Sequence, residues 1–99
     1  MSYYRGNLEV VEATQAQLKE ISEETHSIRA GSTIDPQQRA GEYERDGYSG
    51  TMYTARTENM NRAETQLLQN YDYTHNVHLS SNSPAEPGYV YVIKGKRFN

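Results

Sequence analysis

An Asp-Pro pair at residues 35 and 36 constrains this chain more than any other feature, because it marks where a helix begins. Asp35 can accept hydrogen bonds from the free N–H groups of a first turn, and Pro36 suits the first helical position because it has no N–H to lose. Gly47 follows the expected end of the helix. The pattern predicts a helix over residues 35–46, on which Arg39 and Tyr43 lie one turn apart and face the same way.

A second helix is predicted over residues 58–71, where apolar side chains recur at helical spacing. The stripe consists of Met60, Ala63, Leu67, Leu68 and Tyr71. Glu64 lies at the edge of this stripe, beside apolar neighbours. Its carboxylate is either solvated after a small rotation of the helix or held in a cleft, and the sequence leaves both readings open.

The remaining segments predict one more helix and several short strands. A helix over residues 8–25, capped by Asn7, would bury a stripe of Val11, Thr14, Leu18 and Ile21. Strands are expected over residues 27–30, ending in a turn at Gly31, and over residues 48–56, 74–80 and 89–94. Gly50 would mark a bulge or a close approach of backbone. A strand over residues 74–80 puts His75 and His78 on opposite faces, which argues against a histidine metal pair.

Two segments of the chain resemble the GIY-YIG nuclease superfamily. Its domains carry two tripeptide strands, a helix with an Arg followed four residues later by His or Tyr, and a later helix with a metal-binding Glu. The segment from Gly31 through Asp35, Pro36 and Arg39 to Tyr43 resembles the second tripeptide's glycine and the Arg helix, and Ala63-Glu64-x-x-Leu67-Leu68 resembles the Glu helix. The first tripeptide strand is not upstream; Gly88-Tyr89-Val90-Tyr91-Val92-Ile93 resembles it at the C-terminus. The resemblance therefore implies a circular permutation.

This resemblance implies a fold and a chemistry. The fold would be a single α+β domain over residues 1–99, a small antiparallel sheet flanked by about three helices, with the C-terminal strand beside the strand that ends near Ala30. The chemistry would be hydrolysis of nucleic acid, DNA in preference to RNA, by an endonuclease using Mg²⁺ or Mn²⁺. The implied catalytic residues are Arg39, Tyr43, Tyr91 and Glu64, with Glu64 as the metal ligand. Arg29 and Arg56 would contact the nucleic acid.

Two rival readings remain. Arg29 stands where the second tripeptide has its Tyr, which favours a catalytically inactive module of the same fold that binds nucleic acid or protein. In a third reading the chain is a structural protein, and its C-terminal strand pairs with another subunit to form a homodimer.

Composition narrows the remaining classes. The chain has no Cys, which excludes disulfides and thiolate metal sites. No apolar stretch is long enough to span a membrane, and the first residues lack the apolar centre of a signal peptide, so an intracellular protein with no membrane partner is predicted. The net charge of −3 is not the basic balance of a dedicated nucleic-acid binder. All of this negative charge lies in residues 1–24, which contain five Glu and only two basic residues, Arg5 and Lys19. The rest of the chain is therefore neutral.

Overall fold

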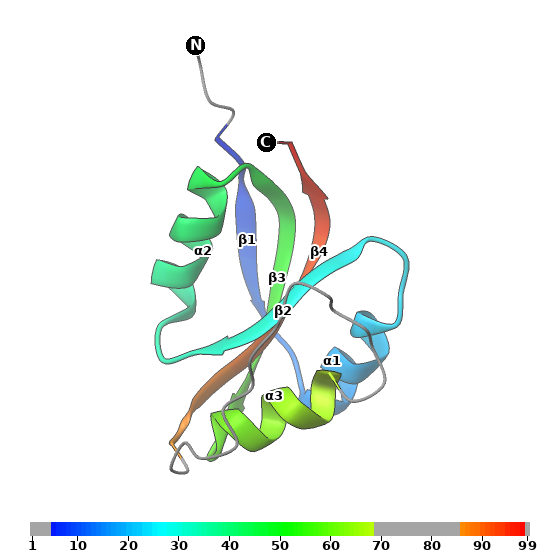
Figure 1. Ribbon diagram of the computed structural model, residues 1–99, viewed down its shortest axis with the longest axis vertical. Helices are drawn as coiled ribbons and strands as arrows, with labels where there is room; N and C mark the ends of the chain where they lie inside the picture. The colour runs from blue at the N-terminus through cyan, green and yellow to red at the C-terminus, as the bar shows by residue number, and fades with distance from the viewer. Residues whose placement is uncertain (1–4, 69–85, 99) are drawn as a thin grey trace.

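The computed structural model describes residues 5–68 and 86–98, which contain seven helices and strands (Figure 1). In chain order they are β1 (Leu8–Glu12), α1 (Gln15–Ser22), β2 (Ser27–Thr33), α2 (Pro36–Arg45), β3 (Tyr48–Thr57), α3 (Met60–Leu68) and β4 (Gly88–Arg97). The strands form one sheet in the order β1-β3-β4-β2. The predicted α+β class is confirmed.

The C-terminal strand β4 lies inside the sheet. It pairs antiparallel with β2 on one side and with β3 on the other. Tyr91 is the register partner of Gly31 on β2 and of Thr54 on β3. The prediction that this strand lies beside the strand ending near Ala30 is confirmed, and β4 extends beyond the expected residues 89–94 at both ends.

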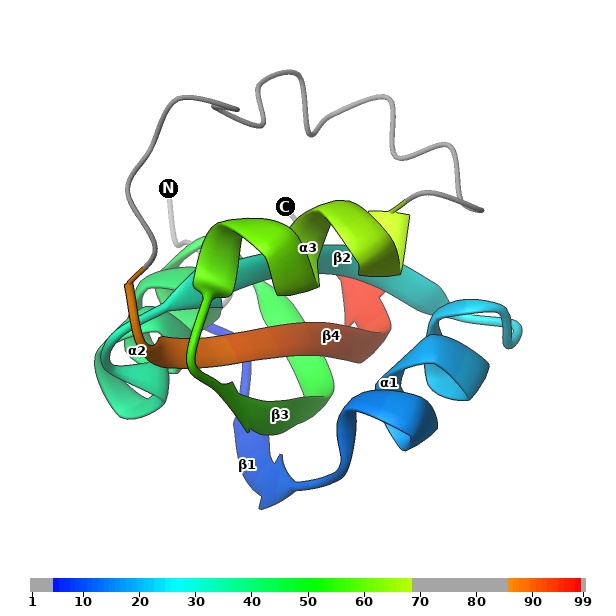
Figure 2. The same ribbon diagram turned by 90° about the horizontal axis from the view of Figure 1, so that it is seen from below.

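Apolar side chains fill both faces of the sheet. One core cluster lies under α1 and α3, which are neighbours (Figure 2), and consists of Leu18, Ala30, Ala55, Ala63, Leu67, Val90 and Val92. The other lies under α2 and consists of Leu8, Ala40, Tyr48, Met52, Tyr91 and Ile93. Alternation along β4 sends Val90 and Val92 to the first face and Tyr91 and Ile93 to the second.

The N-terminal helix predicted over residues 8–25 is present only over Gln15–Ser22, and its first part is wrong. Leu8–Glu12 is instead an edge strand that pairs parallel with β3, so the sheet is mixed and not purely antiparallel. The helix begins after Thr14, whose hydroxyl accepts from the Gln17 backbone N–H while the Gln17 side chain accepts from the Thr14 N–H. This capping box is a stronger start signal than Asn7, and the β-branched Val10 and Val11 before it suit a strand.

The turn predicted at Gly31 is also wrong, because β2 continues to Thr33. Each residue from Ala30 to Thr33 has a register partner on β4, so the ladder with β4 extends the strand past the glycine. Pairing with β4 satisfies the backbone groups on one side of this segment, which favours an extended strand over a turn.

The local signals after β2 are confirmed. The Asp35 side chain accepts from the Gln38 N–H at 3.1 Å and Pro36 occupies the first turn of α2. Strand β3 matches its expected range, and at Gly50, where φ is +134°, an added Cβ would lie 2.2 Å from the Lys94 carbonyl oxygen. That is the expected close approach of backbone.

The second predicted helix is present as α3, which spans nine of the fourteen residues expected from 58 to 71. Residues 69–71, the predicted strand over 74–80 and both of its histidines lie outside the described residues. In the described part of the chain, no helix has both the length and the apolar character needed to cross a bilayer.

Candidate active site

The candidate site forms where Gly31 lies on β2, at one edge of the four-stranded sheet. The Tyr91 ring lies directly against this glycine: a Cβ at residue 31 would be 2.6 Å from the Tyr91 hydroxyl oxygen and 2.8 Å from Cζ. Only a residue without a side chain therefore allows the ring to lie against the β2 backbone. The buried Tyr91 side chain reaches the sheet edge through this gap.

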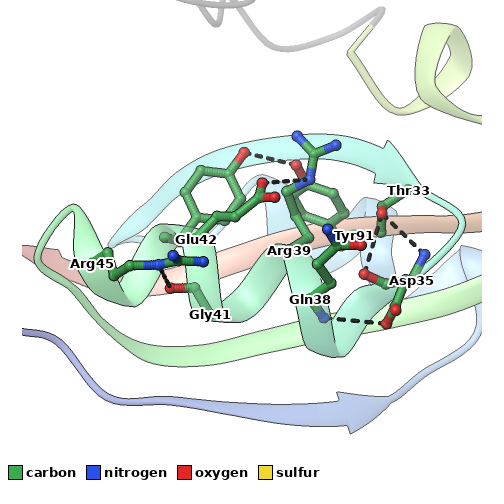
Figure 3. Close-up of polar contacts among 9 residues, drawn as sticks. Thr33, Asp35, Gln38, Arg39, Gly41, Glu42, Arg45 and Tyr91 are labelled. Carbon is green, nitrogen blue, oxygen red and sulfur yellow. Dashed lines mark hydrogen bonds and ion pairs between the residues drawn. The ribbon is translucent and has the colours of Figure 1, made fainter.

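Helix α2 supplies two groups on the same sheet face. The Tyr43 hydroxyl lies 2.7 Å from the Tyr91 hydroxyl, and either oxygen can be the donor. Arg39, one turn earlier, extends from α2 beside the Tyr91 ring, with its Nε 3.4 Å from the Glu42 carboxylate (Figure 3). The predicted shared face of Arg39 and Tyr43 therefore brings both residues to Tyr91.

Helix α3 supplies a carboxylate from the opposite face of the sheet. Glu64 is half-buried, and its Oε1 accepts a hydrogen bond of 2.6 Å from the Ser32 hydroxyl. Ser32 follows Gly31, so its side chain points to the α3 side while the Tyr91 ring lies on the α2 side. The Glu64 carboxylate is therefore half-buried and oriented by one hydrogen bond.

The charges of both helices act on the Tyr91 hydroxyl. Burial is the main reason why the pKa of Tyr91 lies well above its ordinary value, and the neighbouring Tyr43 raises that pKa further. The positive charge of Arg39 lowers the pKa of Tyr91, and the negative charge of Glu64 raises it. Arg39 extends beside Tyr91 on the α2 side of the sheet, Glu64 lies on the α3 side, and Tyr91 keeps its proton at neutral pH.

Arg29 lies beside the two tyrosines. Its guanidinium carbon is 5.8 Å from the centre of the Tyr43 ring, within cation–π range. Burial works to lower the pKa of Arg29, but its interactions with Tyr43, Tyr48 and Tyr91 outweigh this, and the pKa is raised. Its Nε is buried without a hydrogen-bond partner in residues 5–68 and 86–98. Arg29 thus adds a fixed positive charge next to Tyr43.

Arg56, the other predicted contact to nucleic acid, does not join this group. It lies on β3 opposite Tyr89, and lines a separate hollow of about 290 Å³ that also contains Glu12 and Thr54. The acidic Glu12 makes that hollow a poorer place for a phosphate than the face that carries Arg29.

The predicted metal ligand presents a suitable donor. Within the described ranges, no cluster of three or more His, Cys, Asp or Glu side chains occurs. Mg²⁺ does not require one, because it is commonly held by one or two carboxylates while waters and substrate phosphate oxygens complete its shell. Glu64 offers such an oxygen ligand at the sheet edge, with the Ser32 hydroxyl fixing the orientation of the carboxylate.

Two contributors were not predicted. The turn expected at residue 31 gives Ser32 no defined direction, whereas alternation along a continuing strand places the Ser32 side chain on the Glu64 side. Tyr48 contacts Tyr43 edge-to-face at 4.9 Å and extends the tyrosine pair into a cluster of three. Its place at the start of a predicted strand gave no signal for this contact.

Comparisons of the chain with protein-family models, with curated proteins and with solved structures find no match.

Proposed function

We propose that the protein is a metal-dependent endonuclease that hydrolyses phosphodiester bonds of nucleic acid, DNA in preference to RNA, and that it resembles a circularly permuted GIY-YIG nuclease. The observation that carries this proposal is the β2–β4 register, in which Tyr91 is paired with Gly31. Around that pair lie a cation on α2, a carboxylate on α3 and a second tyrosine hydroxyl. These are the groups that a phosphodiester-cutting site needs.

Glu64 is the residue that would hold Mg²⁺ or Mn²⁺. The bound ion would neutralise the negative charge that develops on the phosphate oxygens and the leaving oxygen. The hydrogen bond from Ser32 orients the Glu64 carboxylate at the sheet edge formed by β2.

Arg39 would bind the two non-bridging oxygens of the scissile phosphate. Its pair with Glu42 is loose, since the N–O distance is 3.4 Å and the two side chains are 42% and 45% exposed. A pair of this kind is worth less than about 1 kcal/mol, so a phosphate can displace Glu42 with little loss. The planar guanidinium then matches two phosphate oxygens at once.

The two tyrosines have different roles in this proposal. Tyr91, which keeps its proton, donates or relays a hydrogen bond and positions its partner. Tyr43 is only half-buried, so its hydroxyl is the one that can meet an attacking water. That hydroxyl would orient the water for attack on the phosphate, with the positive charges of Arg29 and Arg39 beside it.

One observation favours a second candidate, a binding module of the same fold without catalysis. Arg29 occupies the position of the second tripeptide's Tyr and fixes a permanent charge against Tyr43. That arrangement strengthens the attraction of a phosphate backbone and does not itself move a proton.

The test is cleavage of single-stranded, duplex and branched DNA and RNA by the purified protein with Mg²⁺ or Mn²⁺. Glu64→Gln keeps the acceptor for Ser32 and removes the charge, so we expect it to abolish cleavage while folding and binding persist. Arg39→Lys should reduce cleavage by about 10²-fold or more, because an ammonium cannot make the forked contact. Glu9→Gln, the same charge change on exposed β1, is the matched control and should cut like the wild type.

If the wild-type protein binds one of these nucleic acids and cuts none, the binding module is the correct reading. If it neither binds nor cuts, the proposed function is wrong.

A further inference from the structure

A hollow of about 310 Å³ opens beside the tyrosine cluster, on the sheet face that carries α2. It is lined by Ile28, Arg29, Tyr48 and Arg97, and we refer to it as the arginine hollow. Two of its four residues are cations and none is an acid. This composition differs from that of the hollow around Arg56, where Glu12 is present.

Both guanidinium groups of the arginine hollow lie over aromatic rings. The Arg97 carbon Cζ is 5.1 Å from the centre of the Tyr48 ring, and that of Arg29 is 5.8 Å from the centre of the Tyr43 ring. The two rings contact each other edge-to-face, so the two cations are attached to one aromatic cluster. Arg97 is further held by a 3.3 Å hydrogen bond from its Nε to the Asp46 carbonyl oxygen.

Neither cation is neutralised. Within residues 5–68 and 86–98 the ion pairs involve Arg5, Arg39 and Lys94, and neither Arg29 nor Arg97 has a carboxylate partner. The charged and titratable groups that act on Arg29 are three tyrosines and no acid. Two pre-oriented guanidinium groups around an open hollow, with no internal counter-charge, form a site for an anion.

We propose that the arginine hollow binds a phosphate of the nucleic-acid strand that neighbours the phosphate held by Arg39. The inference rests on the proposed function and names a second contact for the same substrate. Arg29 and Gly31 lie on the same side of β2, two residues and therefore about 7 Å apart, and Arg39 extends beside the Tyr91 ring that lies against Gly31 (Figure 3). That separation is comparable to the distance between successive phosphates of an extended strand, so one strand following the β2 edge reaches both places.

The arginine hollow gives the substrate a direction. A strand must continue past the scissile phosphate on the Arg29 side to fill it, so cleavage close to the end of a strand on that side should be inefficient. It also gives a role to Arg29, which stands where the resemblance expects a Tyr. A catalytic hydroxyl is replaced there by a guanidinium that binds the phosphate backbone.

The decisive experiment measures binding of fluorescein-labelled single-stranded DNA to the full chain in EDTA, where no cutting occurs, over a series of salt concentrations. Removing one phosphate contact lowers the slope of log K against log salt by about 0.7 for a single strand. Arg29→Gln and Arg97→Gln should each show that loss. Arg62→Gln, an exposed arginine on α3, is the matched control and should keep the wild-type slope.

A second measurement identifies the ligand chemistry. Pyrophosphate titrated into ¹⁵N-labelled protein should shift the Nε–Hε signals of Arg29 and Arg97 and leave that of Arg62 in place. Glutamate peptides at the same concentration should not. Equal shifts with both ligands would overturn the phosphate assignment in favour of an acidic peptide.

The outcomes separate the two proposals. Unchanged slopes in both hollow variants, or an equal loss in Arg62→Gln, overturn the arginine hollow as a strand contact, even if pyrophosphate shifts the arginine signals. If Arg29→Gln fails to fold, the salt slope of Arg97→Gln tests the proposal alone, because Arg97 is exposed. If the slopes fall as expected but the wild type with Mg²⁺ cuts nothing, the hollow stands and the endonuclease proposal fails.

Discussion

At the scale of single residues, Gly31 determines where the Tyr91 hydroxyl lies. Gly31→Ala would put a methyl group within 2.8 Å of two Tyr91 atoms, so the ring must move away from Tyr43. We expect a loss of about 1–3 kcal/mol in the free energy of unfolding, the usual cost of overpacking, measured by urea titration. Gly41→Ala is the control: nothing lies within 4 Å of its added Cβ on α2, so it should gain about 0.5–1 kcal/mol. Equal effects would mean that the Tyr91 ring does not lie against residue 31.

The buried Tyr91 also makes a prediction about pH. Its pKa is raised in the folded chain, while in the unfolded chain it ionises near pH 10. Above about pH 10 the folded state therefore keeps a proton that the unfolded state loses, and the free energy of unfolding falls as pH rises, by up to about 1.4 kcal/mol per pH unit. Below that pH the group contributes no slope.

Tyr91→Phe should remove the part of the decrease in unfolding free energy above about pH 10 that Tyr91 causes. The variant will be less stable than the wild type at pH 7 by about 1 kcal/mol, because Tyr43 loses its partner, and the difference should shrink above pH 10. Chemical denaturation at a series of pH values measures both effects. Parallel curves for the two proteins would contradict the burial of the hydroxyl.

At the scale of elements, the N-terminus of α2 is held by Asp35. Asp35→Ala removes the acceptor for the Gln38 N–H and should cost about 1 kcal/mol in the free energy of unfolding. Asp35→Asn keeps an acceptor at the same position and should cost much less. A denaturant titration that gave equal losses for both would assign the effect to the charge and not to the cap.

Elements with their own start and stop signals were predictable. The range of α2 follows from Asp35, Pro36 and Gly47, and it carries Arg39 and Tyr43 to one face without any knowledge of the rest of the chain. Strand β1 was not predictable in this way, since Leu8–Glu12 has too few residues to separate a strand from a helix by periodicity. Its pairing with β3, in which Leu8 is the partner of Gly50, decides between them.

The candidate site likewise contains some features that the sequence predicts and others that depend on tertiary pairing. The i, i+4 pair on α2 and the glycine at residue 31 could be identified in the sequence, whereas the Ser32–Glu64 hydrogen bond depends on how far β2 continues along β4. The aromatic cluster that holds Arg29 and Arg97 joins residues from β2, α2, β3 and β4. Such contacts arise from tertiary packing, so local sequence patterns do not predict them.

At the scale of the whole molecule, both ends of the described chain lie at one place. The Gly6 N–H donates to the Glu44 carbonyl oxygen at 2.8 Å, and the Phe98 N–H donates to the Gly47 carbonyl oxygen at 3.0 Å, so the ends meet beside the α2–β3 connection (Figure 1). A short flexible linker can therefore join residue 98 to residue 5, and the chain can be opened anew between residues 69 and 85. This permutant begins with β4, the strand that resembles the family's first one.

We expect the permutant to fold into the same sheet, because β4 makes its contacts with β2 and β3 whichever end of the chain supplies it. Its circular dichroism spectrum and backbone amide shifts over β2 and β3 should match those of the wild type, and its Tm should lie within about 5 °C, the shift that a change of about 1 kcal/mol produces in a domain of this size. A chain ending at residue 87 is the control and should not fold, since β2 would lose its only strand partner in the described sheet. A permutant that fails to fold would show that the chain requires β4 at its C-terminus, and the proposed permutation would lose its structural basis.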